Sequence, residues 1–349
     1  MQKSSLFKKH SISLIAIFII GNTLIYFPNK LDIKSSSLGL ILSITLSIPL
    51  FLLFYKINKK CLSTNILEEI KYNSNKLYKI ILCAIFLISA FLIALPCLSE
   101  YVSYVNRFRM PLTYKIIISV IFMALVIYIA YSKKSAIYKL SIICFIYVLL
   151  SSVILFILSF NHFDFSNLLP VEFKGKDVLS SIIILIAKSF ATIILLSLFF
   201  KNEKDKPRSI YLMGLFLGGI ILFICVLNVL LIFGSKITEE LSLPYANAMS
   251  VISLGDVFTR LEGFSYLNYF ACSIIKTATC LFIIKTIAYE FFEKKANYIV
   301  FLFSLISIIL TLFDKLPEIF YSLPFNIVLI LFEAALIIAL SLYKKQVKK

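Results

Sequence analysis

Ten apolar runs, each about the length needed to cross a bilayer, fill most of this 349-residue chain. A hydrocarbon core about 30 Å thick requires about 20 mostly apolar residues in helical form. Membrane-barrel strands alternate polar and apolar residues over about 10 positions, whereas these runs are apolar on all sides. The sequence therefore predicts an all-α polytopic membrane protein with about ten transmembrane helices. The runs are 11–27, 38–55, 80–105, 116–131, 140–160, 178–200, 210–233, 267–289, 298–313 and 326–343.

The gaps between the runs alternate in lysine and arginine content. The gaps on the side of the two termini hold more than twice as many of these residues as the gaps on the opposite side. Because basic loops stay in the cytoplasm, we expect both termini to be cytoplasmic. The net charge of +17 is then mostly loop charge that faces anionic lipid headgroups, so membrane lipid is the expected partner and nucleic acid is not.

The arrangement of the spans predicts one transmembrane domain over residues 1–349, because no gap is long enough to build a separate core. Ten spans divide into five and five, and an odd number per half places the halves in opposite orientations. This is the arrangement of a transporter-like inverted repeat, whose substrate site lies at the midplane and is made by broken helices. The pseudo-repeats would cover roughly 11–160 and 178–343. They are inferred from topology and not from sequence identity.

The first span contains an expected break. Gly21, Asn22 and Thr23 interrupt the apolar run, glycine weakens a helix, and an asparagine is costly against lipid. An unwound segment would free backbone groups to bind a small zwitterion. The alternative is that Gly21 only allows close helix packing. The sixth span has no glycine and carries Lys188 and Ser189 at its middle, which weakens the case for a second broken helix.

Three lysines remain inside the spans, of which Lys285 lies near a cytoplasmic end and is expected to extend to the interface. Lys188 and Lys276 lie near the midplane, where a charge costs at least about 2.5 kcal/mol. The carboxylates available as partners are Glu100 and Glu333. In the functional interpretation, an ammonium replaces a coupling cation or titrates as one. In the structural interpretation, the lysines form buried ion pairs or are neutral.

An outer gap carries a cluster of charges. Asp256 and Arg260 have helical i,i+4 spacing and Glu262 follows them, so the segment taken alone predicts a solvated interfacial helix. The seven cysteines form no CxxC pattern and the two histidines are far apart in sequence. We therefore expect neither a metal site nor a cofactor, and the chain shows no nucleophile with its base that would indicate an enzyme.

Several short motifs occur in a set order along nearly the whole chain. They are Ile12-Ser13-Leu14 with Gly21 and Pro28, Leu98-Ser99-Glu100, Met110-Pro111-Leu112-Thr113, Asp164 with Leu168-Leu169-Pro170, Leu254-Gly255-Asp256, Arg260-Leu261-Glu262, and Lys276. In these motifs the chain resembles the permease-like B subunits of spore germinant receptors, in the amino acid–polyamine–organocation transporter superfamily. Two departures are Tyr114, where the family usually has a second proline, and the absence of any tryptophan after the Arg-x-Glu motif.

The resemblance implies a subunit that binds a small nutrient, often an amino acid, and triggers germination from the inner membrane of the spore, beside A-type and C-type receptor subunits. Gly21, Asn22 and Thr23 would contact the ligand. Glu100, Lys188, Ser189 and Lys276 would line or gate the cavity, and segment 256–262 would lie at the outer mouth or at a subunit contact. The alternatives are a proton-coupled amino-acid permease and a structural subunit that has lost its ligand site.

Overall fold

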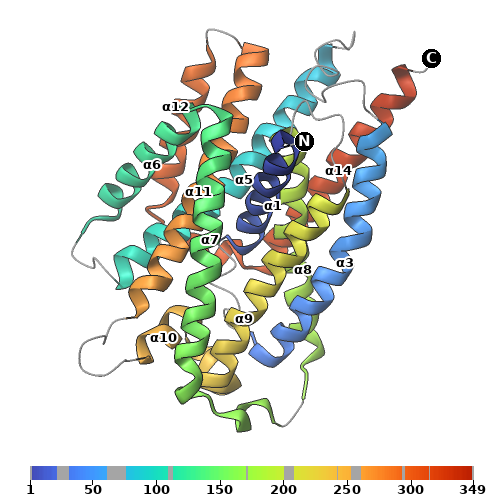
Figure 1. The fold of residues 1–349 in the computed structure, drawn as a ribbon. Helices are drawn as coiled ribbons and strands as arrows, with labels where there is room; N and C mark the ends of the chain where they lie inside the picture. The colour runs from blue at the N-terminus through green and yellow to red at the C-terminus, as the bar shows by residue number, and fades with distance from the viewer. Residues whose placement is uncertain are drawn as a thin grey trace.

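The protein is a bundle of long helices, and all regular structure in the described residues is helical (Figure 1). The computed structural model describes residues 2–21, 31–60, 76–108, 113–169, 172–199, 208–241, 243–252, 261–292, 295–313 and 315–347. The long helices are α1 (Gln2–Ile20), α3 (Ile33–Lys60), α5 (Lys76–Phe108), α6 (Lys115–Tyr131), α7 (Lys134–Leu158), α8 (Gly175–Phe199), α9 (Arg208–Glu240), α11 (Glu262–Phe292), α12 (Ala296–Leu310) and α14 (Leu323–Val347). The short elements are η1 (Ser159–His162), η2 (Phe165–Leu168), α10 (Pro244–Val251) and α13 (Leu316–Phe320).

The predicted apolar runs fall on these long helices, which confirms the all-α membrane fold. Five described segments are long and apolar enough to cross a membrane: Ile33–Leu52, Ile80–Asn106, Lys134–His162, Ser209–Glu240 and Glu262–Phe292. Shorter apolar helices accompany them, and the bundle surface exposes side chains such as Ile121, Ile157 and Phe301 that suit contact with lipid. The chain is therefore an integral, multi-pass membrane protein. A total of ten crossings, and the division into two pseudo-repeats, stay predictions.

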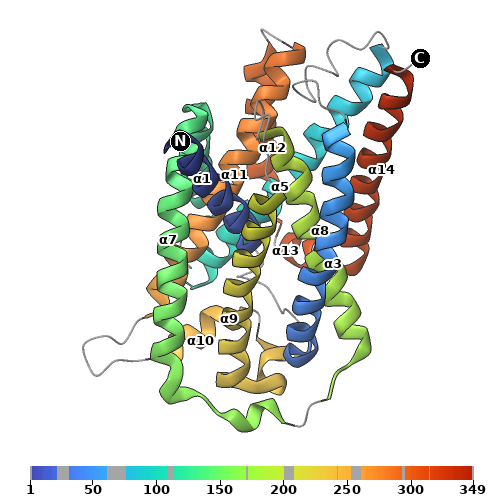
Figure 2. The same ribbon diagram turned by 45° about the vertical axis from the view of Figure 1, so that its right-hand side comes forward.

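Helix α11 lies at the centre of the bundle, where it packs against α5, α6, α7 and α12 (Figure 2). It is the most enclosed of the five long apolar segments. On another side of the molecule, α3 lies against α8 and α9, and α14 lies against α8. Helix α1 contacts α7, α8, α9 and α11. Helix α1 is thus surrounded by elements from both halves of the chain.

Glycine residues bring α9 into close contact with α1. A methyl group at Gly214 would lie 2.6 Å from Cβ of Ile15, and one at Gly218 would lie 3.0 Å from Cβ of Ile19. Small residues four positions apart allow helix backbones to approach closely in membranes. The spacing Gly214-x-x-x-Gly218 therefore fixes how α1 and α9 pack.

The loop between α7 and α8 is fastened to α9 by its backbone. The Asp164 N–H donates to the carbonyl oxygen of Leu231 at 2.9 Å, and the Asn167 amide donates to the same oxygen at 3.1 Å. This carbonyl lies three residues before Gly234, where φ is +66° and α9 kinks. The loop thus satisfies a backbone acceptor next to the kink.

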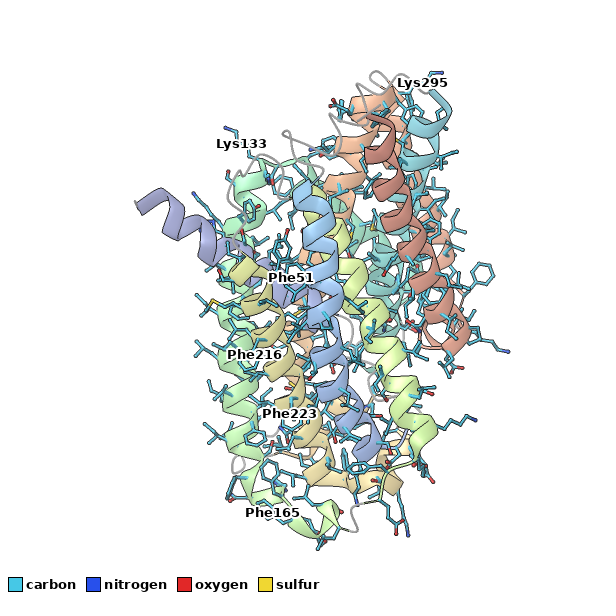
Figure 3. The ribbon with its side chains drawn as sticks, turned by 90° about the vertical axis from the view of Figure 1, so that its right-hand side faces the viewer. Phe51, Lys133, Phe165, Phe216, Phe223 and Lys295 are labelled. Atoms are coloured by element: carbon cyan, nitrogen blue, oxygen red, sulfur yellow. The ribbon has the colours of Figure 1, made fainter. Side chains whose placement is uncertain are left out.

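The basic gaps and the α7–α8 loop lie at opposite ends of the bundle. Lys133 and Lys295, from two gaps predicted to be cytoplasmic, lie at one end, while Phe165 lies at the other (Figure 3). The ends of the chain lie towards the lysine end (Figure 1). This arrangement has the relative sidedness that the lysine distribution predicts, and the assignment of one end to the cytoplasm stays a prediction.

Candidate functional site

Helix α1 ends at the position where the sequence analysis placed a possible break. Its last helical residue is Ile20, and Gly21 follows with φ of +21° while its N–H donates to the carbonyl oxygen of Ile17 at 2.8 Å. A positive φ is readily adopted only by glycine, so Gly21 permits the helix to end inside the bundle. The last carbonyls of any helix lack partners within the helix, and here they face buried surroundings. Asn22 and Thr23 lie outside the described residues.

Lys276 of α11 lies against this end of α1. Its side chain is 3% exposed, and its ammonium Nζ donates to the carbonyl oxygen of Phe18 at 3.0 Å. A Cβ added at Gly21 would lie 3.1 Å from both Nζ and Cδ of Lys276. Gly21 therefore serves two purposes, since it ends the helix and leaves room for the lysine. A cation at the carboxyl end of a helix is also favoured by the helix dipole.

Two more of the predicted site residues join this centre. Glu100 of α5 is fully buried, one turn after Pro96. The charges of Glu100 and Lys276 both act on Lys188 of α8, and all three act on the Cys97 thiol. Residues from α5, α8 and α11 thus share one electrostatic environment beside the end of α1.

Helix α8 runs without interruption from Gly175 to Phe199. The sixth span is therefore unbroken at Lys188, as its lack of glycine favours. The Lys188 Nζ lies 3.1 Å from the ring centroid of Tyr321, at the end of α13. This nitrogen is buried and has no hydrogen-bond partner in the described part of the chain. Ser189 is the next residue of α8, and the position of its side chain lies outside the description.

The other candidates lie elsewhere. Neither carboxylate oxygen of the buried Glu333 makes a hydrogen bond in the described part of the chain, so the considered pairing of Glu333 with a span lysine is wrong. Lys285 donates to the Ala130 carbonyl oxygen at 2.7 Å, near the end of α6. Glu262 begins α11, whereas Asp256 and Arg260 lie outside the described residues. Within the described ranges, no group of three His, Cys, Asp or Glu side chains could hold a metal ion.

An aromatic cluster that the sequence analysis did not select joins α5 to α11. The hydroxyls of Tyr101 and Tyr266 are 2.7 Å apart, and the rings of Tyr104 and Tyr269 meet edge to face with centroids 4.8 Å apart. Tyr101 and Tyr104 lie within about one turn of Glu100, and Tyr269 and Tyr266 lie about two and three turns before Lys276. In the sequence, each of the two spans carries two tyrosines at i,i+3 spacing, which places them on one face of the helix. The two pairs are near the same end of the antiparallel spans, and this pattern could have indicated the cluster.

A separate cavity of about 590 Å³ opens beside the α7–α8 loop, and charged residues of both signs line it. Lys174 and Glu239 form an ion pair at 2.6 Å, which raises the pKa of Lys174. Burial opposes ionisation of Asp32, but hydrogen bonds from the Ser35 hydroxyl and N–H outweigh it and lower the pKa of Asp32. These contacts place a charged, polar cavity at the end of the bundle that carries Phe165.

The end of α1 beside Gly21, the unbroken α8 and the buried charges lie in a bundle with the fold of a membrane transporter. A solved structure that shares this fold is that of Mhp1, a nucleobase-cation-symport-1 family transporter in a closed conformation with bromovinylhydantoin bound, with a TM-score of 0.52 and 14% sequence identity. The match covers 94% of this chain and 74% of that one. The model of the spore germination protein family matches residues 5–319, so the chain belongs to this family of spore permeases. No curated protein matches the chain.

Proposed function

We propose that the protein is the membrane subunit of a spore germinant receptor, which binds a small nutrient, an amino acid, in the transporter-like bundle and triggers germination. The observation that carries this proposal is the buried polar centre at the end of α1, where the Lys276 ammonium donates to the Phe18 carbonyl oxygen at 3.0 Å. Burying a charged side chain inside a membrane costs free energy, so such residues usually mark a functional site. Membership of the spore germination protein family supports the same conclusion.

In this proposal each predicted residue has a part. Gly21, with Asn22 and Thr23 after it, presents backbone and amide groups to the ligand. Glu100, Lys188, Ser189 and Lys276 line or gate the cavity, and segment 256–262 forms the outer mouth or a subunit contact. The ligand must bind one bundle arrangement more tightly than the other, since equal affinity would shift no population.

The ammonium of Lys276 acts as a built-in cation in the proposed mechanism. It donates a hydrogen bond to the Phe18 carbonyl oxygen at the carboxyl end of α1. In a transporter coupled to a metal cation, the cation would be coordinated by a carbonyl oxygen in this position. Because the lysine is tethered to α11, the site keeps its positive charge without an ion gradient. A sensor requires a stable ligand-free state, and the hydrogen bond from the Lys276 ammonium to the end of α1 stabilises that state.

The second candidate function is a proton-coupled amino-acid permease. The observation that favours it is the set of ionisable groups in one buried environment, where Glu100 or Lys276 would gain or lose a proton during a transport cycle. In both candidates the protein lies in the inner membrane of the spore with both termini cytoplasmic. The receptor alone requires the A-type and C-type subunits as partners.

Uptake and germination measurements separate the two candidates. The purified protein is reconstituted in liposomes with a proton gradient and offered labelled amino acids, and a deletion strain is tested for germination with the same amino acids. The receptor proposal predicts loss of germination with little uptake. Robust uptake together with normal germination of the deletion strain would exclude the receptor and favour the permease.

A further inference from the structure

The ammonium nitrogen of Lys188 is buried in the bundle beside an aromatic ring. Its nitrogen has no hydrogen bond in the described part of the chain, and the group in contact with it is the face of the Tyr321 ring, 3.1 Å from the nitrogen to the centroid. An aromatic face attracts a cation but leaves the N–H donors unused. Buried charges in proteins are normally paired and hydrogen-bonded, so the contact with Tyr321 leaves this ammonium incompletely satisfied.

The position of Lys188 matters because α8 is unbroken there. In transporters with broken helices, the amino ends of half-helices hold the anionic group of the substrate. The backbone N–H groups in the middle of a continuous helix are used within the helix, so the midpoint of α8 has no free backbone N–H donors for an anion. A lysine at this midpoint supplies the positive charge that the helix backbone does not.

The charges of the surrounding groups also favour an anionic ligand at Lys188. Lys188 shares its electrostatic environment with one more lysine, Lys276, and one carboxylate, Glu100. Lys276 is already engaged by the Phe18 carbonyl oxygen at 3.0 Å. When all three are ionised, the group carries one excess positive charge, and a single ligand carboxylate would neutralise it.

We propose that Lys188 binds the carboxylate of the nutrient ligand, and that the Tyr321 ring covers the ammonium until the ligand displaces it. The inference rests on the proposed function and narrows its ligand to compounds with a free carboxylate. It also assigns Tyr321, at the end of α13, as the group that leaves the site on binding. Ligand entry thereby moves the junction between α13 and α14.

The test compares each L-amino acid with its own α-amide on the purified full-length protein. The panel of standard L-amino acids is first scanned by thermal shift, and the affinity of each hit and its amide is then measured by calorimetry. In Lys188→Met, we expect the affinity for the amino acid to fall about 10- to 100-fold, because a hydrogen bond to a charged group is lost. The affinity for the amide should change less than about 2-fold. Lys285→Met is the matched control, since it removes another span lysine and should leave both affinities unchanged.

Tyr321 gives an independent measurement if Lys188→Met fails to fold. Tyr321→Leu removes the ring that competes for the ammonium, so the amino acid should bind about 2- to 10-fold more tightly. Tyr321→Phe keeps the ring and should bind like the wild type. An unchanged affinity in Tyr321→Leu would contradict the proposal.

The outcomes distinguish this inference from the proposed function. Wild-type affinity of Lys188→Met for the amino acid, or an equal loss of amino acid and amide, would overturn the role of Lys188 while the receptor stands. Failure of every amino acid to bind the wild-type protein would overturn the proposed function and this inference together.

Discussion

Replacing Lys276 by methionine tests the centre of the proposed site. The change keeps the length and apolar stem of the side chain but removes the ammonium that donates to the Phe18 carbonyl oxygen at 3.0 Å. A hydrogen bond from a charged donor contributes about 1.5–3 kcal/mol, and removal of the donor leaves a buried carbonyl at the end of α1. A change of about 2 kcal/mol in favour of an altered α1 corresponds to about a 30-fold shift between two bundle arrangements.

We therefore expect Lys276→Met to abolish the nutrient response, or to raise the nutrient concentration for half-maximal germination at least about 10-fold. Germination is followed by the loss of optical density of spores, and protein level by immunoblot of the spore inner membrane. Lys285→Met is the control, because Lys285 donates to a carbonyl at the end of α6, away from Gly21. A normal response of Lys276→Met at normal protein level would refute the reasoning. Loss of the protein itself would show that the lysine is structural.

Three further predictions concern packing and buried polar groups. Gly218→Val should destabilise the bundle by about 1–3 kcal/mol, because its side chain would collide with Ile19; the thermal midpoint in detergent measures this, and an unchanged midpoint would contradict the packing. Tyr101→Phe and Tyr266→Phe should each cost about 1 kcal/mol and be non-additive in a double-mutant cycle, because they remove the same 2.7 Å contact; additive losses would rule out the contact. Glu333→Gln should leave thermal stability unchanged or raised, since the carboxylate makes no hydrogen bond in the described residues; a clear loss would reveal a partner.

Much of the fold could be predicted because the bilayer fixes both the length and the composition of a span. At Gly21 the sequence allowed both a break and close helix packing, and the structure shows that α1 ends just before this residue. The absence of glycine between Gly175 and Gly214 only weakened the case for a second break, and the structure shows that α8 is continuous.

The contacts of the site were less predictable, because they join distant parts of the chain. Glu100, Lys188 and Lys276 were selected as charges that the loops could not absorb, but no periodicity indicates that Lys276 meets Phe18. Tyr321 carries no local signal, because a tyrosine near a helix end is ordinary in a membrane protein. The pairing of Glu333 with a lysine failed because charge alone does not reveal which face of α14 a residue occupies.

The interlocking of α1 with α9 has a mechanical consequence. Ile15 and Ile19 of α1 pack directly against Gly214 and Gly218 of α9. Because these helices are in close contact, a change in the tilt of α1 requires α9 to move as well. Helix α9 in turn is tied through the Leu231 carbonyl to the loop before α8. A movement at the end of α1 is therefore coupled through α9 to the α7–α8 loop at the opposite end of the bundle. That loop is a surface on which a neighbouring protein would meet the change.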